Sequence, residues 1–381
     1  MAGMRLIHLA GYGGPYPGSF IPMLRAIMRA AEERGWTCEA VFTPISRERA
    51  WLAELEEDGI PYRFPPEGAS RRELTGWIAG MLAEDDGPAI LHTHFTHFDV
   101  AAAMAGSQRD RTRVVWHIHT PHLKGAPAFA RNYLKYAVFG RRVDQILCVS
   151  PDLVDTITTR GAPRKKVEFL HNAVDVDRFP VLTDEQRHAA RDEFGLPAGR
   201  PLLVHFGWDW LRKGGDVFEE ALRRLRDSDA NLAGVTVGGG DDARSLGERL
   251  GLGDELTVLE PTDKVQQMYA AADVFVAPSR AEGTPFSVLE AVSSGTAAVV
   301  SDIPGHATVG AHAPACVITP LDPDAVAAAI RRLLEREPAQ VAADSLAGHA
   351  WLRENLGLRP WAEAMVERYE RLAAGSAAQL R

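Results

Sequence analysis

The sequence predicts an α/β protein with two doubly wound parallel sheets, each forming a domain of its own. Three observations lead to this prediction. The chain has 381 residues, more than the roughly 250–300 at which a single core usually stops growing. Short apolar runs alternate with longer helical patterns, as is typical of βαβ units. The same rhythm restarts after a break near residue 180.

The runs that predict strands fall into two series. In the first half they are RLIHLA, CEAVF, AILHTHF, RVVWHIHT, QILCVS and KVEFLH, with the helical pattern PMLRAIMRAAEERG after the first run. In the second half they are PLLVHFGW, AGVTVGGG, ELTVLE, DVFVAPS, AAVVSDI and ACVITP. Pro180 and the polar residues after it break both periodicities, so we expect the domain boundary near residues 175–185.

Charge and cysteine content narrow the functional classes. The formal net charge is −9, and no Lys/Arg-rich stripe follows a predicted helix, which argues against a nucleic-acid partner. Cys38, Cys148 and Cys316 lie in apolar runs, which suits buried thiols in a reducing compartment. The opening apolar run is too short for a secretory signal, and no stretch reaches the ~18–20 apolar residues of a membrane span. We expect a cytoplasmic protein.

Residues 129–139, FARNYLKYAVF, form a basic and aromatic segment. We expect a solvated helix face there. The alternative is peripheral contact with an anionic lipid surface or an acceptor.

Doubly wound sheets bind ligands at loops that follow the carboxyl ends of their strands. The most informative such loop lies in residues 277–295, APSRAEGTPFSVLEAVSSG. We expect Thr284 to cap the following helix and Pro285 to be its first residue. The N–H groups at residues 286–288 and the helix dipole then favour an anion, and a diphosphate fits.

Two glutamates flank this predicted anion site. Glu290 follows Pro285 by five residues, roughly 7.5 Å along a helix, which is about the reach from a phosphate to its ribose. We therefore expect Glu290 to accept from ribose hydroxyls, the alternative being a buried carboxylate bound to an arginine. Glu282 is expected at the transferred sugar, the alternative being a carboxylate that only stabilises the helix dipole.

A second loop carries positive charge. In HFGWDWLRKGG, residues 205–215, Arg212 and Lys213 precede two glycines and a helical pattern. A diphosphate leaving group gains negative charge as its glycosidic bond breaks, and fixed cations stabilise that charge. We expect this pair at the diphosphate, the alternative being surface ion pairs.

These motifs resemble those of the retaining GT-B glycosyltransferases of glycosyltransferase family four (glycosyl transferases group 1), over nearly the whole chain. The most specific likeness is the pair Glu282 and Glu290 within PSRAEGTPFSVLEAVSSGT. Supporting segments are GYGGPYPGSF, SPDLVDTITTRG, HNAVDVDRF and the RKG around Lys213. The chain departs from the family where Trp208 replaces an arginine, where Asn172 is followed by alanine, and near Thr308, where a glutamate is usual.

The resemblance implies a GT-B fold, with two Rossmann-like domains facing across a cleft. Residues 1–178 would bind the acceptor and be completed by the C-terminal helix 360–381, and residues 179–359 would bind the donor. It implies catalytic roles for His119 at the transferred sugar, Lys213 at the diphosphate and Glu282. The donor-binding residues would be Gly13, Gly14, Arg212, Gly283, Thr284, Pro285, Phe286, Ser287 and Glu290. Family members usually need no bound metal, so no cofactor is expected beyond the nucleotide-sugar co-substrate.

Two histidine clusters remain, each with H-x-H-x-x-H spacing: His92, His94 and His97, and His117, His119 and His122. Strand alternation puts the first two of each set on one face, where a metal site is conceivable. We favour the alternative, in which they line the acceptor site or satisfy core polar contacts. The candidate acceptor residues are His94, Asp99, His122 and Tyr16, with Asp99 as the nearest carboxylate for activating a hydroxyl.

The predicted function is retaining, metal-independent transfer of a hexose-like sugar from a nucleoside diphosphate to a hydroxyl acceptor, in carbohydrate biosynthesis. One alternative is a nucleotide-sugar epimerase of the same fold, which would convert the donor alone. Another is an inactive protein that binds nucleotide sugars. A dehydrogenase is disfavoured because GYGGPYPG lacks the third glycine of a dinucleotide-binding loop. The base, sugar, acceptor and oligomeric state are not specified by these patterns.

Overall fold

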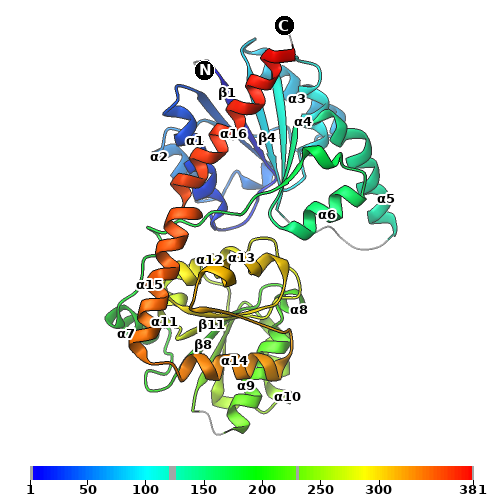
Figure 1. The fold of residues 1–381 in the computed structure, drawn as a ribbon. Coiled ribbons are helices and arrows are strands. Elements are labelled where there is room, and N and C mark those ends of the chain that lie inside the picture. Colours follow the sequence, from blue (N-terminus) through cyan, green and yellow to red (C-terminus); the bar gives the residue numbers. More distant parts are fainter. Residues whose placement is uncertain (1–2, 120–125, 229–230, 380–381) are drawn as a thin grey trace. The chain divides into compact units, whose positions relative to one another are not determined.

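The structure, a computed structural model, describes residues 3–119, 126–228 and 231–379. The chain divides into two compact units (Figure 1). Unit 1 comprises Met1–Ala173 and Leu358–Arg381, and unit 2 comprises Val174–Gly357. Each unit is a parallel sheet covered by helices, which confirms the predicted α/β class. None of the described helices combines the length and the apolarity needed to cross a membrane.

The sheet of unit 1 has seven strands among its described residues, in the order β3-β2-β1-β4-β5-β6-β7. The order reverses between β1 and β4, and such a switch point opens a ligand crevice outside the carboxyl ends of the strands. The strands are β1 (Arg5–Ala10), β2 (Thr37–Phe42), β3 (Tyr62–Arg63), β4 (Ala89–His94), β5 (Thr112–Ile118), β6 (Gln145–Cys148) and β7 (Val167–Phe169).

Helices cover both faces of this sheet, and α1 packs with α16 while α3 packs with α4 (Figure 1). Ile7, Leu9 and Leu91 point into the apolar core on the α3 and α4 side. Side chains alternate along a strand, so the histidines at positions 8, 92 and 94 face the α1 and α16 side. The helices are α1 (Phe20–Glu32), α2 (Leu52–Glu57), α3 (Arg71–Ala83), α4 (Asp99–Gly106), α5 (Ala126–Leu134), α6 (Pro151–Thr159) and α16 (Leu358–Gln379), and a π-helix spans Lys135–Phe139.

The sheet of unit 2 has six strands among its described residues, in the order β10-β9-β8-β11-β12-β13. Its switch point lies between β8 and β11, the two strands that lead into the motif loops. The strands are β8 (Leu202–Phe206), β9 (Ala233–Val237), β10 (Leu256–Leu259), β11 (Val274–Ala277), β12 (Ala297–Ser301) and β13 (Cys316–Thr319). The helices are α7 (Asp184–Glu193), α8 (Trp210–Lys213), α9 (Gly215–Asp227), α10 (Gly240–Arg249), α11 (Val265–Ala271), α12 (Phe286–Ser293), α13 (Pro304–His312), α14 (Pro323–Leu334) and α15 (Pro338–Asn355).

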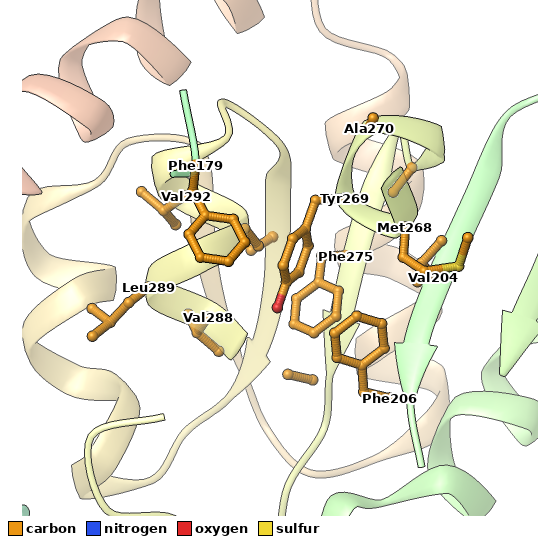
Figure 2. Close-up of a cluster of buried hydrophobic side chains, with 14 of the residues drawn as sticks. Phe179, Val204, Phe206, Met268, Tyr269, Ala270, Phe275, Val288, Leu289 and Val292 are labelled. Carbon is orange, nitrogen blue, oxygen red and sulfur yellow. The ribbon is translucent and has the colours of Figure 1, made fainter. Parts of the chain in front are cut away.

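An aromatic cluster holds α11 and α12 against this sheet. Figure 2 shows the ring of Tyr269 between Phe179 and Phe275, with Val288, Leu289 and Val292 nearby. The Tyr269 ring lies 5.3 Å from that of Phe206 and 5.4 Å from that of Phe275, centroid to centroid. The helix that carries Glu290 is therefore fixed by buried apolar contacts.

The division between the units falls at Ala173 and Gly357, whereas the sequence placed it at residues 178 and 359. The N–H of Val174 donates to the carbonyl of Leu356 (2.8 Å), and Val174 forms a β-bridge with Gly357. This pairing draws the segment after Ala173 into unit 2, where Phe179 is buried in the core.

Candidate functional site

A glycine holds the two motif loops of unit 2 against each other. Gly214 has a φ of +73°, and a Cβ atom there would lie 1.9 Å from the carbonyl oxygen of Pro278. Glycine tolerates both this backbone conformation and this approach. The N–H of Arg280 also donates to the carbonyl of Arg212 (2.8 Å). The loop after β8 therefore ends beside the loop that carries Glu282.

Three predicted site residues meet at this contact. Glu282 pairs with Lys213 Nζ (2.7 Å) and with a guanidinium nitrogen of Arg212 (3.0 Å), and Ser279 Oγ donates to it (3.0 Å). Burial by itself would raise the pKa of the Glu282 carboxyl, but the two cations lower it below its ordinary value. The structure thus brings together an ionised carboxylate and two cations at the switch point of the sheet.

The helix that follows begins one residue later than predicted. Pro285, not Thr284, is the N-cap residue of α12, with an extended ψ of 117°, and its carbonyl accepts from the N–H groups of Val288 and Leu289 (both 3.2 Å). The N–H of Val288 is therefore hydrogen-bonded within the first turn, contrary to the expectation that it would face a ligand. The N–H groups of Phe286 and Ser287 precede the first intrahelical bond and are the ones left for an anion.

Glu290 lies in the buried part of α12. Tyr269 Oη donates to its carboxylate (2.8 Å). The two partners considered from the sequence were a ribose hydroxyl and an arginine, and a tyrosine was not among them. Tyr269 was missed at the sequence level. The apolar pattern VQQMYAAA indicates that this tyrosine is buried. A buried tyrosine hydroxyl usually has a hydrogen-bond partner, so the pattern could have pointed to a polar contact there.

Two further histidines of unit 2 were also missed. His205 and His306 line a cavity of about 10 Å³, together with Lys213, Ser279 and Ser287. Nδ1 of His205 donates to the Val276 carbonyl (3.0 Å) and Nδ1 of His306 to the Ser301 carbonyl (2.9 Å). Each Nε2 is then a lone-pair acceptor when the ring is neutral.

In unit 1, the loop after β1 packs on neighbouring side chains. Trp51 Nε1 donates to the carbonyl of Gly14 (3.0 Å), and Tyr12 Oη donates to that of Tyr16 (2.7 Å). A Cβ atom at Gly13 would lie 2.6 Å from Ile45. The glycines thus fit a tight loop, with Tyr16 exposed at its tip.

The strand histidines of unit 1 form one buried cluster. His8 of β1, His92 and His94 of β4, and His117 of β5 are fully buried, and His119 follows directly after β5. Within the described residues, two groups place ring nitrogens within 4.8 Å of one another: His8, His92 and His94, and His94, His117 and His119. Burial lowers the pKa of His8 and of His119 to about 3. These rings are held neutral.

One predicted acceptor residue, Asp99, lies away from the histidine cluster. Asp99 is fully buried and pairs with Lys135 Nζ (2.5 Å), while the hydroxyl of Thr93 also donates to it. The side chain of Thr93 points to the face of the sheet opposite to His92 and His94, so its partner Asp99 lies on that opposite face. Its bonds argue against the predicted role in activating an acceptor. His122 lies outside the described residues.

Comparisons with known proteins agree with the motifs. Residues 23–178 match the family described as Glycosyltransferase Family 4, and residues 200–336 match Glycosyl transferases group 1. The D-inositol 3-phosphate glycosyltransferase of Mycolicibacterium smegmatis is 29% identical over 75% of this chain and 72% of its own length. The 2-deoxystreptamine glucosyltransferase of Streptomyces kanamyceticus is 29% identical over 56% of each chain.

Solved structures share the fold of the whole chain. A glycosyltransferase from Rickettsia africae superposes with a TM-score of 0.80 at 14% identity, covering 97% of this chain and 98% of its own. HepE of Anabaena, in complex with UDP and glucose, superposes with a TM-score of 0.78 at 17% identity, covering 96% and 99%. The fold is thus that of GT-B glycosyltransferases, and the chain belongs to glycosyltransferase family 4, the group 1 glycosyl transferases.

Proposed function

We propose that this chain transfers a sugar from a nucleoside diphosphate to an acceptor hydroxyl, with retention of anomeric configuration and without a bound metal. The observation that carries the proposal is the cluster of Lys213, Arg212 and Glu282 at the switch point of unit 2. It lies on the loops that lead into α12, where the first N–H groups of a helix favour an anion.

The cluster suits a leaving group that gains charge. As the bond between the anomeric carbon and the diphosphate oxygen breaks, Lys213 and Arg212 stabilise the departing diphosphate, which is most effective in the transition state. The acceptor oxygen forms its bond to the anomeric carbon on the same face, and its proton passes to the departing phosphate oxygen. Glu282 gives up some of its contacts with the two cations and accepts hydrogen bonds from hydroxyls of the sugar instead.

Two further observations support a nucleotide-sugar donor. Glu290 is fixed on α12 by Tyr269, at a distance along the helix that suits a ribose next to a phosphate at the N-terminus of α12. Solved structures of the same fold include HepE with UDP and HepE with UDP-glucose. A donor of this chemical class therefore accounts for both glutamates.

A thermal-shift panel of uridine, guanosine, adenosine and thymidine diphosphates, each with and without magnesium, tests the donor site. A ligand that binds only the folded state raises the unfolding temperature according to its affinity. We expect one base to give a shift that magnesium does not change. Absence of a shift with all four, or a shift that requires magnesium, would contradict the proposal.

Product analysis with the sugar nucleotide of that base tests the reaction. NMR of the anomeric proton distinguishes retention from inversion in the transferred sugar. A parallel incubation without any acceptor is the control, because conversion of the donor alone into a second nucleotide sugar would identify an epimerase instead.

A further inference from the structure

Three imidazoles of unit 1 form a hydrogen-bonded chain that ends at His119. Nε2 of His119 lies 3.0 Å from Nδ1 of His94, and Nε2 of His94 lies 2.9 Å from Nδ1 of His8. His8 lies on β1, His94 on β4 and His119 directly after β5, and these strands are neighbours, with β1 paired to β4 and β4 to β5. Both nitrogens of His94 are therefore engaged, one with each neighbour.

The chain couples the tautomers of its members. A neutral imidazole carries one N–H donor and one lone-pair acceptor, and each bond in the chain needs one of each. Only two proton arrangements satisfy both bonds. In the first, Nδ1–H of His8 donates to His94 and Nδ1–H of His94 donates to His119, which then carries its own proton on Nδ1. In the second, every proton sits on Nε2 and both bonds run in the opposite direction.

The far end of the chain selects between these arrangements. Nε2 of His8 is buried and has no hydrogen-bond partner among the described residues. The first arrangement leaves a lone pair there, and the second leaves an N–H. Among buried backbone groups, an N–H without a partner is rarer than an acceptor without one, and by the same reasoning the first arrangement is favoured.

We propose that His94 and His8 are positioning residues that hold His119 as a neutral hydrogen-bond donor, with its proton on Nδ1. This inference rests on the proposed function and on the role at the transferred sugar that the family resemblance implies for His119, and it assigns the kind of contact. Nδ1–H would donate to a sugar hydroxyl oxygen and would keep its proton during transfer. His119 would accordingly not act as the base that receives the acceptor proton.

A metal ion bridging these rings is the competing explanation of the cluster, and the geometry favours it less. Both nitrogens of His94, the residue shared by the two ligand groups, are already hydrogen-bonded. Neither group contains a carboxylate or a thiolate that would offset the charge of a buried divalent cation, which is costly without such a partner.

The test is the protonation state of each ring nitrogen in the free protein, read from long-range ¹H–¹⁵N correlation spectra after labelling with ¹⁵N-histidine. We expect protonated Nδ1 and unprotonated Nε2 on His8, His94 and His119. A proton on Nε2 of His119, or a doubly protonated ring at neutral pH, would overturn the proposal. So would displacement of the His94 and His117 signals by one equivalent of zinc chloride.

Two leucine variants separate positioning from packing. His94→Leu cuts the chain, so His119 should lose its fixed tautomer, and turnover should fall on the order of tenfold or more. His117→Leu is the matched control, since that ring is equally buried, lies 4.1 Å from the His119 ring between centroids, and has no partner on either nitrogen among the described residues. It should leave the His119 tautomer and the turnover unchanged.

An equal loss of turnover in both variants, with the His119 tautomer unaltered in both, would show a purely structural role and refute the proposal. His94→Asn adds a rescue test, because its amide can still bond His119. Partial recovery of turnover over His94→Leu is expected. The spectra do not depend on turnover, and binding of nucleoside diphosphate to unit 2 reports separately on the proposed function.

Discussion

The two sheets carry opposite kinds of polar group at their switch points. In unit 2, Lys213, Arg212 and Glu282 are charged and paired within 3.0 Å. In unit 1, the rings around His94 are neutral, and burial together with the neighbouring rings keeps the pKa of His94 well below its ordinary value. The same topology thus supports a site for charge in one unit and a site without charge in the other.

This difference shows what the fold determines and what the side chains determine. A doubly wound sheet fixes where loops converge, but the chemistry depends on the residues placed there. Paired charges in unit 2 exchange partners with a charged ligand at little desolvation cost. Neutral rings in unit 1 suit hydroxyl groups, which need directed hydrogen bonds and no counter-charge.

The largest expected effect is acid destabilisation through the rings of unit 1. Burial lowers the folded-state pKa of His8, His92, His94 and His117 below the ordinary 6.5. Below about pH 6.5 the unfolded chain binds protons that the folded chain excludes, so stability falls as the pH falls. Each group would contribute on the order of 1.4 kcal/mol per pH unit. The unfolding temperature, measured by calorimetry from about pH 7 to pH 5, should fall steeply as the pH falls below about 6.5.

Single-histidine variants identify the source of this slope. His117→Leu should make the acid branch shallower, because one buried titrating group is removed. His188→Leu is the control, since His188 is exposed on α7 and should leave the slope as it is. If the unfolding temperature fell as steeply with pH in His117→Leu as in the unmodified protein, the acid destabilisation would not come from the buried histidines of unit 1.

The next effect concerns the charged site. Lys213→Ala should lower the turnover for sugar transfer on the order of 10²-fold to 10³-fold, because a fixed cation is lost where the diphosphate charge develops. Lys264→Ala is a matched control, as that lysine pairs with Glu193 at an exposed position. Steady-state kinetics with the donor identified by thermal shift measures both. Equal turnover in the two variants would mean that Lys213 does not stabilise the departing diphosphate.

The loops of both sites could be predicted because they follow local rules. Apolar alternation located the strands, and glycines and charged residues marked the loops that we propose as ligand-binding. The start of α12 was predicted one residue too early, since the φ of proline fits both an extended N-cap and a helical first turn, and only ψ, here 117°, decides. The burial and pairing of Asp99 could not be predicted, because its partner Lys135 lies 36 residues further along the chain.

The contacts between distant strands could not be predicted in the same way. The His8 and His94 rings meet only because β1 pairs with β4 in one register, and a shift by one residue would turn every side chain to the other face. The bond from Tyr269 to Glu290 likewise joins two helices across a core. Such pairs depend on packing, which a pattern along the chain does not encode.

A smaller effect is expected from Glu282→Gln, which keeps the side-chain size but removes the charge. Arg212 and Lys213 would lose their buried counter-ion, and the free energy of unfolding should fall by about 1–3 kcal/mol. Binding of the nucleoside diphosphate should be kept or strengthened, because Glu282 no longer neutralises Lys213 and Arg212 keeps only its pair with Asp209, whereas transfer should be impaired. Calorimetric titration and kinetics separate these results, and a parallel loss of binding and transfer would argue that Glu282 only supports the fold.

An effect of similar size, confined to single hydroxyl groups, gives the most direct comparison between the units and comes from two buried tyrosines. Tyr269→Phe removes the hydroxyl that donates to Glu290 in unit 2, and Tyr369→Phe removes the hydroxyl that bonds His92 in unit 1. Each should cost about 1–3 kcal/mol, since a buried polar group loses a partner, and each should lower the unfolding temperature by several degrees. Only Tyr269→Phe should also weaken binding of the nucleoside diphosphate, because Glu290 is then less firmly held. Equal affinity in the two variants would mean that Glu290 does not contact the nucleotide, and the donor site would then rest on the cation cluster and the first N–H groups of α12.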